Sequence, residues 1–257
     1  MPDPFRGRHA LVTGASSGIG AELARQLAQR GANLVLVARR EDRLAELAKE
    51  CALFGVAAEA APGDLADPAI RADLAARFPD TDILVNNAGL GAFGPFAETE
   101  WDRLERVMTV NMTALTHLTH LFAPGMAQRG FGRIMLVAST AAFQPVPLYA
   151  VYAATKSFVL SLGTSLNVEL AGQGVKTTVL CPGVTETEFF AVAAQKKSAF
   201  VERSSMSSAT VARIGLDALA KGRATAVAGA LNAAMAFGTR LAPRGLTARI
   251  AYRSLKP

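Results

Sequence analysis

The segment YAVYAATK, residues 149–156, places a phenol and an ammonium group at a spacing that suits proton transfer. Tyr152 precedes Lys156 by four residues, and residues four apart share one face of an α-helix. A free phenol has a pKa of about 10, which is too high for free proton exchange at neutral pH, and a nearby positive charge lowers it. The spacing therefore predicts that Lys156 lowers the pKa of Tyr152. Tyr152 would then be the acid in a carbonyl reduction and the base in an alcohol oxidation.

The second tyrosine of this segment is too far from the lysine to share that role. Tyr149 lies seven residues before Lys156, at or before the expected start of the helix. We expect Tyr149 to line the substrate side of the site or to pack as an ordinary aromatic residue.

Short apolar runs alternate with helical patterns along the chain, and these elements must position the tyrosine. The expected strands cover residues 9–14, 33–39, 57–65, 82–89, 132–139 and 175–183. The expected helices cover residues 18–30, 41–54, 67–77, 99–128, 150–171 and 208–221, and residues 184–205 form a loop with short helical pieces. Most strands are continuously apolar, as buried parallel strands are. The alternation predicts a single α/β domain with a doubly wound parallel sheet of the Rossmann type and right-handed crossovers.

The bulk composition fits one globular domain. The chain has 257 residues, of which 51% are hydrophobic and 19% charged, which suits a sizeable core and argues against extended disorder. No apolar signal segment precedes residue 9, and no apolar run approaches the roughly 18 residues of a spanning helix. Cys51 and Cys181 are the only cysteines, and His117 with His120 suits a helix surface better than a metal site. We therefore expect a cytoplasmic protein without a metal ion.

A glycine-rich turn, TGASSGIG at residues 13–20, follows the first expected strand and opens the first helix. Glycine allows a backbone to approach a ligand closely, and a helix N-terminus offers free N–H groups and a positive dipole end to a pyrophosphate. This context predicts a dinucleotide site rather than a turn that binds nothing. The residues assigned to it are Gly14, Ser16, Ser17, Gly18, Ile19 and Gly20.

The end of the second expected strand bears on which dinucleotide binds. An acidic residue there would bond the adenosine ribose, but this strand ends VARR, with Arg39 and Arg40. Arginine can hold a 2′-phosphate, so the pair predicts NADP(H). The alternative is two surface arginines at a helix start.

Several motifs occur together in the order typical of one family, and on them the chain resembles the short-chain dehydrogenase/reductase (SDR) family over about residues 6–220. The motifs are TGASSGIG, GDL at 63–65, NNAG at 86–89, Asn111 within TVNMTA, Ser139, the pair Tyr152 and Lys156, and PGVTET at 182–187. Thr185 departs from the family, which usually has an aliphatic residue at that place.

The resemblance implies a role for each catalytic residue. Ser139 would bond the substrate oxygen beside Tyr152, and two donors aimed at one developing oxyanion stabilise the transition state. Lys156 would also bond the nicotinamide ribose. Asn111 would hold a water that links Lys156 to solvent, although it could instead bond its own helix backbone.

The resemblance also implies further cofactor contacts, which are Asp64, Leu65, Asn87, Ala88, Gly89, Tyr152, Lys156, Pro182, Gly183 and Thr187. Asp64 would touch the adenine, or it could cap a helix. Asn86 is expected to bond neighbouring strands instead of the cofactor.

The expected substrate rim is mostly apolar and suits a hydrophobic ketone, aldehyde or alcohol. Its residues are Ser139, Ala141, Phe143, Val146, Tyr149, Val184 and the loop 188–200. Lys196 and Lys197 in that loop are expected to be solvated charges rather than ligands for an anionic group.

The C-terminal extension, residues 221–257, carries the excess positive charge of the chain. Residues 218–257 hold seven basic residues and no acid, so the rest of the chain has a charge of 6 − 7 = −1. Apolar residues recur in it at helical spacing, at Leu231, Ala234, Met235, Gly238 and Leu241. We expect the extension to pack on its own domain or on a second subunit. A basic amphipathic end can also lie on an anionic membrane surface, whereas the scarcity of aromatic residues argues against nucleic acid.

We predict an NADP(H)-dependent oxidoreductase that transfers a hydride between nicotinamide and a small carbonyl or alcohol substrate. Residues 1–220 would form the cofactor-binding and catalytic domain, and a homodimer would form through the helices at 99–128 and 150–171. Two alternatives remain, which are a sensor or scaffold protein that binds NADP(H) without turnover, and an epimerase or dehydratase. The intact Ser139, Tyr152 and Lys156 argue against the first, and the glycine spacing argues against the second.

Overall fold

Seven parallel strands form one sheet in the order β3-β2-β1-β4-β5-β6-β7 within the described chain. The computed structural model describes residues 3–189, 193 and 205–255. The strands are β1 (His9–Thr13), β2 (Asn33–Ala38), β3 (Ala58–Pro62), β4 (Ile83–Asn86), β5 (Gly132–Val137), β6 (Val175–Cys181) and β7 (Thr225–Val227). The chain moves outward from β1 to β3 and then restarts at β4 on the other side, so the doubly wound Rossmann-type fold is confirmed.

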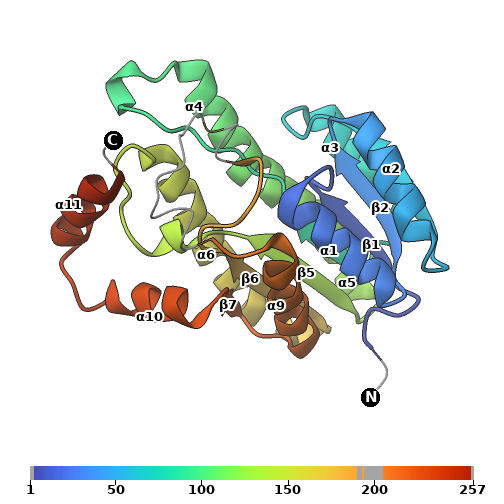
Figure 1. Cartoon of the computed structure of the whole chain (residues 1–257). Coiled ribbons are helices and arrows are strands. Elements are labelled where there is room, and N and C mark those ends of the chain that lie inside the picture. Colours follow the sequence, from blue (N-terminus) through green and yellow to red (C-terminus); the bar gives the residue numbers. More distant parts are fainter. Residues whose placement is uncertain (1–2, 190–192, 194–204, 256–257) are drawn as a thin grey trace.

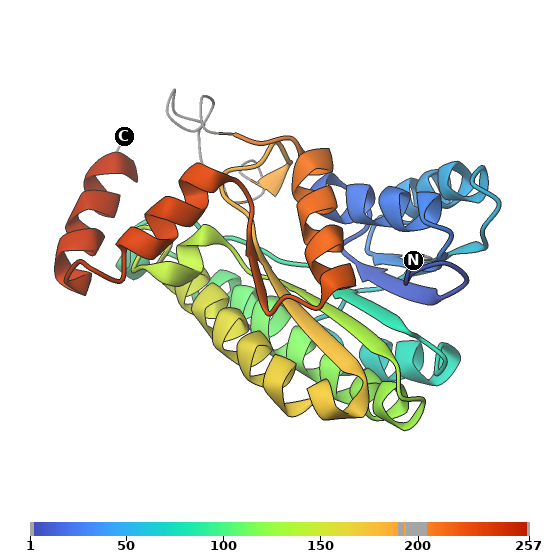
Figure 2. The same cartoon turned by 90° about the horizontal axis from the view of Figure 1, so that it is seen from below.

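Helices cover both faces of the sheet, as Figure 2 shows. On one face lie α1 (Gly18–Gln29), α2 (Glu41–Ala52) and α9 (Ser208–Lys221), and on the other lie α3 (Pro68–Arg77), α5 (Leu115–Gln128) and α6 (Ala150–Glu169). Each layer has its own buried apolar cluster against the sheet. Leu23, Leu44 and Leu216 belong to the first, and Phe122 and Val159 belong to the second.

The expected helix at 99–128 is interrupted. α4 (Trp101–Met108) passes into a π-helical segment, Thr109–Ala114, before α5 begins. In a π-helix each N–H bonds five residues back, which widens the turn and redirects the side chains there. Asn111 lies in this segment and is fully buried.

The sheet extends past residue 220, which the sequence did not predict. β7 pairs in parallel with β6, with Cys181 opposite Val227. α10 (Ala230–Gly238) and α11 (Arg244–Leu255) follow, and they lie at the edge of the molecule far from α1, α2 and α3 (Figure 1). Short 3-10 helices are Phe96–Glu98, Thr140–Phe143 and Ala171–Gln173.

Within the described ranges, no helix is long and apolar enough to cross a membrane. In the same ranges, no group of three or more His, Cys, Asp or Glu gathers as a metal site would require. Both cysteines are buried as free thiols.

Candidate active site

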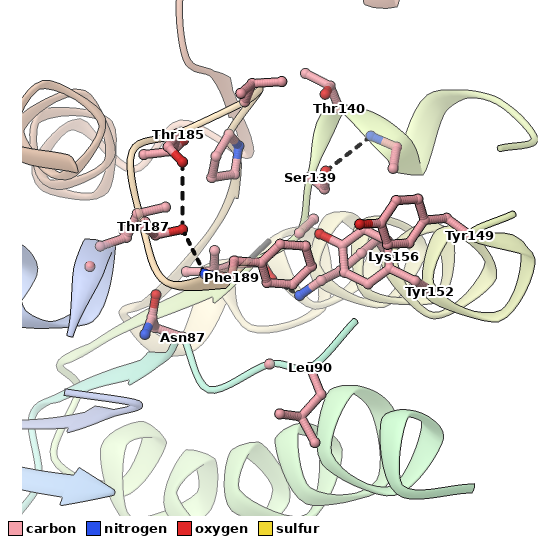
Figure 3. A pocket seen from close by; sticks show the side chains of 18 of the residues that line it. Asn87, Leu90, Ser139, Thr140, Tyr149, Tyr152, Lys156, Thr185, Thr187 and Phe189 are labelled. Atoms are coloured by element: carbon pink, nitrogen blue, oxygen red, sulfur yellow. Dashed lines mark hydrogen bonds between the residues drawn. The ribbon is translucent and has the colours of Figure 1, made fainter. Parts of the chain in front are cut away.

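One cavity of about 840 Å³ runs along the carboxyl ends of the central strands, from the glycine-rich turn to α11. In a doubly wound sheet this is the edge at which ligands bind, because the chain changes direction between β1 and β4. Asn87, Ser139, Tyr152, Lys156 and Thr187 all face this cavity (Figure 3).

Tyr152 and Lys156 lie on one face of α6, as their spacing predicted. Lys156 Nζ is 5.7 Å from the centroid of the Tyr152 ring and donates to the Val137 carbonyl at 2.8 Å. The Ser139 side chain, at the end of β5, hydrogen-bonds the Tyr152 phenol and accepts from the Ala141 amide at 3.1 Å. The structure thus brings the serine, the tyrosine and the lysine together.

The pKa of Tyr152 is raised, and the expected lowering does not occur. Burial raises the pKa of Tyr152 to about 12, and the hydrogen bond with Ser139 offsets only part of that rise. Burial also lowers the pKa of Lys156 to about 8, because the ammonium loses its hydration. The prediction was wrong because it counted the attraction of the lysine and left out the desolvation of the phenol.

Tyr149 both lines the cavity and packs against aromatic neighbours. It is the N-cap residue of α6, and burial raises its pKa. Its ring centroid lies 5.1 Å from that of Phe93 and 5.6 Å from that of Tyr152. Both roles expected for Tyr149 are therefore met by one position.

Phe189 completes this aromatic row on the far side of Tyr152. Its ring centroid is 5.2 Å from that of Tyr152 (Figure 3). A Cβ at Gly91 would lie 2.6 Å from the Phe189 ring, so any larger residue there would displace that ring. The sequence placed the rim in the loop 188–200 without singling out Phe189. Residues 190–192 and 194–200 of that loop, which include Lys196 and Lys197, lie outside the described residues.

Asn111 fixes the backbone beside the lysine. Its Oδ1 accepts from the Leu90 amide at 2.8 Å, while its Nδ2 donates to the Leu90 carbonyl at 2.9 Å and to Thr155 Oγ1 at 3.0 Å. Both ends of the amide are therefore occupied by another segment of the chain. This arrangement differs from the alternative of a bond to its own helix, and the expected water relay stays a prediction.

The first turn of α1 and the two arginines after β2 form a cationic end of the cavity. Arg40 donates to Ser16 Oγ at 3.0 Å and to Ser17 Oγ at 2.9 Å. Its other terminal nitrogen donates to Glu188 Oε2 at 2.8 Å. Arg39, Gly14, Gly18 and Ile19 also line the cavity, and the Gly20 Cβ position would meet the Gly14 carbonyl at 2.2 Å. This donor set fits a dinucleotide with a phosphorylated ribose.

Asp64 and Leu65 also line the cationic end of the cavity. The helix N-cap is Asp67, which accepts from the Ala69 amide, so Asp64 does not cap α3. Asp64 pairs with Arg106 and accepts from the Ala66 amide. Burial alone would raise the pKa of Asp64, but these partners lower it below its ordinary value.

The NNAG motif, residues 86–89, lies between the cationic end of the cavity and the end that holds Tyr152. Asn87 Nδ2 donates to the Thr13 carbonyl at 3.0 Å, and Asn87, Ala88 and Gly89 line the cavity. Asn86 turns away and donates to Thr119 on α5 at 3.0 Å, rather than to a neighbouring strand as expected.

The motif after β6 connects the catalytic end to the C-terminal helices. Pro182, Gly183, Val184 and Thr187 line the cavity, and Thr185 donates to the Gly183 carbonyl at 3.0 Å. A Cβ at Gly183 would lie 2.4 Å from Asn232 Nδ2 of α10. The glycine therefore allows α10 to pack directly on this motif.

Two aspects of the substrate rim differ from the expectation. Phe143 does not line the cavity and packs instead against the apolar cluster beneath α6, while Gln144 faces the opening. The 3-10 helix Thr140–Phe143 turns the phenylalanine inward. α10 and α11 supply lining residues that the sequence did not assign, and these include Met235, Ala236, Thr247, Ile250 and Ala251.

The comparisons with known proteins agree with this geometry. Residues 8–198 match the family model described as short chain dehydrogenase. A Streptomyces violaceoruber protein named "Granaticin polyketide synthase putative ketoacyl reductase 1" is 44% identical over 184 residues, which cover 69% of this chain and 68% of that protein.

Solved structures resemble nearly the whole chain. A short-chain dehydrogenase from Sphingobium yanoikuyae in complex with NADPH has a TM-score of 0.84 and 36% identity, and the match covers 93% of this chain and 95% of that one. The bulky-bulky ketone specific alcohol dehydrogenase from Comamonas testosteroni has a TM-score of 0.78 and 30% identity, with 93% of each chain covered.

The chain therefore belongs to the short-chain dehydrogenase/reductase family of nicotinamide-dependent oxidoreductases, and the resemblance found in its sequence is confirmed. The extension, residues 221–257, lies outside the segment that matches the family model.

Proposed function

We propose that the protein is an NADP(H)-dependent reductase of an apolar carbonyl compound. The observation that supports this most directly is the convergence of Ser139, Tyr152 and Lys156 on one end of a cavity whose other end is cationic. A carbonyl reduction needs donors for the developing oxyanion beside a nicotinamide, and this arrangement supplies both in one space.

The side chains divide the chemistry among them. The bound cofactor supplies the hydride. Ser139 and Tyr152 donate hydrogen bonds to the substrate oxygen, and Tyr152 gives up its proton as the alcohol forms. Lys156 holds the nicotinamide ribose and stabilises the phenolate left on Tyr152. Asn111 keeps the Leu90 backbone in place beside them.

Arg40 supports NADP(H) rather than NAD(H) as the cofactor. Its guanidinium lies against Ser16 and Ser17 in the glycine-rich turn, with Arg39 on the same rim, where the adenosine ribose would lie. A 2′-phosphate there would gain charge-assisted hydrogen bonds from the arginine. The NADPH complex of the Sphingobium relative agrees with this choice.

An apolar substrate is supported by the lining of the catalytic end. Val146, Tyr149, Phe189, Met235 and Ile250 line the same cavity as Tyr152 and Ser139. Such a lining binds by excluding water from apolar surface and leaves orientation to the few polar donors. The names of two relatives, a ketoacyl reductase and a bulky-ketone alcohol dehydrogenase, are consistent with this class.

The test replaces one hydroxyl group. Tyr152→Phe should lower kcat for carbonyl reduction by about 10²–10⁴-fold, the usual contribution of a positioned acid. NADPH binding, followed by its fluorescence, should persist. Tyr149→Phe is the matched control and should retain most of the activity. Turnover by Tyr152→Phe at the wild-type rate would refute the assignment, and NADPH binding by the wild type without turnover on any carbonyl of a panel would favour the sensor or scaffold alternative.

The proposal also includes partners and location. We propose a homodimer that forms through the helices at 99–128 and 150–171. A cytoplasmic location stays a prediction from the sequence.

A further inference from the structure

The outer surface of α10 and α11 exposes an unusual amount of apolar side chain. Of the thirteen large hydrophobic residues exposed within the described ranges, seven lie between residues 231 and 252. Leu231, Phe237 and Leu241 are 70%, 60% and 78% exposed, and Leu246 and Ile250 on α11 are 51% and 56% exposed. A concentration of this kind marks an interaction site, because isolated apolar residues are ordinarily scattered over a surface.

The charged residues of α11 and of the turn that joins it to α10 are all positive. Arg240, Arg244, Arg249 and Arg253 belong to a stretch, residues 218–257, without a single acid. Among the described residues, no carboxylate lies within ion-pair distance of these four arginines. We call these four arginines, together with Leu231, Phe237, Leu241, Leu246 and Ile250, the docking face.

The charges of the docking face indicate which kind of partner it binds. In a symmetric dimer the same patch meets itself, so pairing through the docking face would bring arginines against arginines with no acid to neutralise them. An anionic bilayer offers an apolar interior for the leucines and phenylalanine and negative headgroups for the arginines. On α11, Leu246, Arg249 and Arg253 recur three and four residues apart, so apolar and cationic groups share one side of the helix.

The mouth of the active-site cavity opens beside this face. Met235 and Ile250 line the cavity and are also 50% and 56% exposed, so they stand at its rim. The inner sides of the same two helices carry the lining residues Ala236, Thr247 and Ala251. A compound dissolved in the bilayer would therefore reach the rim without crossing bulk water.

We propose that the docking face seats α10 and α11 on an anionic phospholipid bilayer, and that a lipid-dissolved carbonyl substrate enters the cavity past Met235 and Ile250. The second half of this inference rests on the proposed function, whereas the first half stands without it.

Charge is tested with vesicles. The whole protein should co-sediment with vesicles of phosphatidylcholine containing phosphatidylglycerol far more than with phosphatidylcholine alone, and about 0.5 M salt should reduce the binding. Arg249→Gln with Arg253→Gln should weaken binding by about 30-fold. As a control, Arg6→Gln with Lys49→Gln removes the same amount of charge from exposed residues elsewhere and should change vesicle binding little. Equal weakening by both pairs, or equal binding to both vesicle types, would overturn the proposal.

The apolar contribution is tested in parallel. Phe237→Ser with Leu241→Ser should abolish sedimentation, and Leu53→Ser with Phe96→Ser, which are exposed elsewhere, should not. If light scattering instead shows that Phe237→Ser with Leu241→Ser splits a dimer, a second copy covers the face and the bilayer proposal is wrong.

Enzyme kinetics separates this inference from the proposed function. None of the four substituted docking-face residues lines the cavity, so these variants should reduce a water-soluble ketone at the wild-type rate. They should lose several-fold in rate on a long-chain ketone presented in anionic vesicles. Equal rates of wild type and variants on the vesicle-borne ketone would overturn the entry route. Vesicle binding by a wild type that reduces no carbonyl would leave the docking face intact and refute the proposed function.

Discussion

Tyr152 holds its proton firmly, since burial raises its pKa to about 12. A protonated phenol is the form that a carbonyl reduction requires, whereas an alcohol oxidation requires the phenolate. At neutral pH the phenol is therefore in the form that a reduction would use. In the proposed reaction Lys156 would contribute at a different point, because its ammonium would stabilise the phenolate only as Tyr152 gives up its proton.

The pH dependence of reduction should follow the lysine. The pKa of Lys156 is lowered to about 8, so its charge is present below that pH and lost above it. We expect kcat/KM for NADPH, which reports groups of the free protein, to fall about tenfold per pH unit above roughly pH 8. Lys156→Arg keeps a charge at high pH and should move the fall upward. A profile that is flat from pH 6 to 10 would contradict this role of the lysine.

Asn111 should matter for stability as well as for activity. Asn111→Ala removes the partners of the Leu90 amide and carbonyl, and unpaired backbone groups of this kind cost about 1–3 kcal/mol. We expect a lower Tm, measured by calorimetry without cofactor, together with a lower kcat. Thr116→Ala is the control, because the Thr116 hydroxyl on α5 has no hydrogen-bond partner among the described residues, and it should change neither Tm nor kcat much. A fall in kcat with an unchanged Tm would point to a pure water relay.

At the scale of elements, the segment after β6 connects the two ends of the cavity. The Thr187 side chain lies close to Gly18 at the start of α1, and Glu188 hydrogen-bonds Arg40 and Arg43. The Phe189 ring lies beside that of Tyr152 and is tilted against it. Glu188 thus occupies donors that a 2′-phosphate would use. A bound 2′-phosphate would have to compete with this carboxylate, whereas NADH, which lacks the phosphate, would not.

Cofactor preference should respond to this competition. Glu188→Gln removes the competing charge and should raise the ratio of kcat/KM for NADPH to that for NADH by severalfold. Arg40→Gln should lower the same ratio by tenfold or more, since charge-assisted hydrogen bonds are the strong ones. Glu186→Gln, in the same segment but bonded to Ser205, is the matched control and should leave the ratio unchanged. A ratio that falls in Glu188→Gln would mean that the carboxylate assists phosphate binding.

Elements with strong patterns could be predicted from the sequence, and those decided by tertiary contacts could not. The first six strands were found because their apolar runs are bounded by turns and helices. β7 has only three half-buried residues and exists because the edge of β6 offers it hydrogen-bond partners. The π-helical segment leaves no mark in residue types, because it differs from an α-helix only in which carbonyl each amide bonds.

The same division holds within the candidate site. The spacing of Tyr152 and Lys156 fixed their common face, and the glycine-rich turn fixed the cofactor end. The pKa of Tyr152, the partners of Asn111 and the lining by α10 and α11 depend on burial and on contacts between distant segments. Neither the burial of a side chain nor its contacts with distant segments can be predicted from the neighbouring residues in the sequence.

For the molecule as a whole, the proposed dimer needs a surface separate from the docking face, and α6 provides one. Phe158, Ser161, Ser165 and Val168 recur along one exposed side of it, with Val168 77% exposed. Small and apolar residues in a row allow two copies of the helix to approach closely around a twofold axis. Ser161 lies in the middle of the row, so a long charged side chain there would be forced against its own copy.

We therefore expect Ser161→Arg to convert a dimer into a monomer, as measured by light scattering coupled to size-exclusion chromatography. Ser254→Arg, on α11 at the far edge of the molecule, is the control for an added charge at an exposed helical serine and should leave the mass unchanged. Because α10 and α11 take no part in this pairing, vesicle binding should persist in the Ser161→Arg monomer, weakened only because one docking face replaces two. A wild-type protein that is monomeric, or a dimer that Ser161→Arg leaves intact, would show that α6 is not the subunit interface.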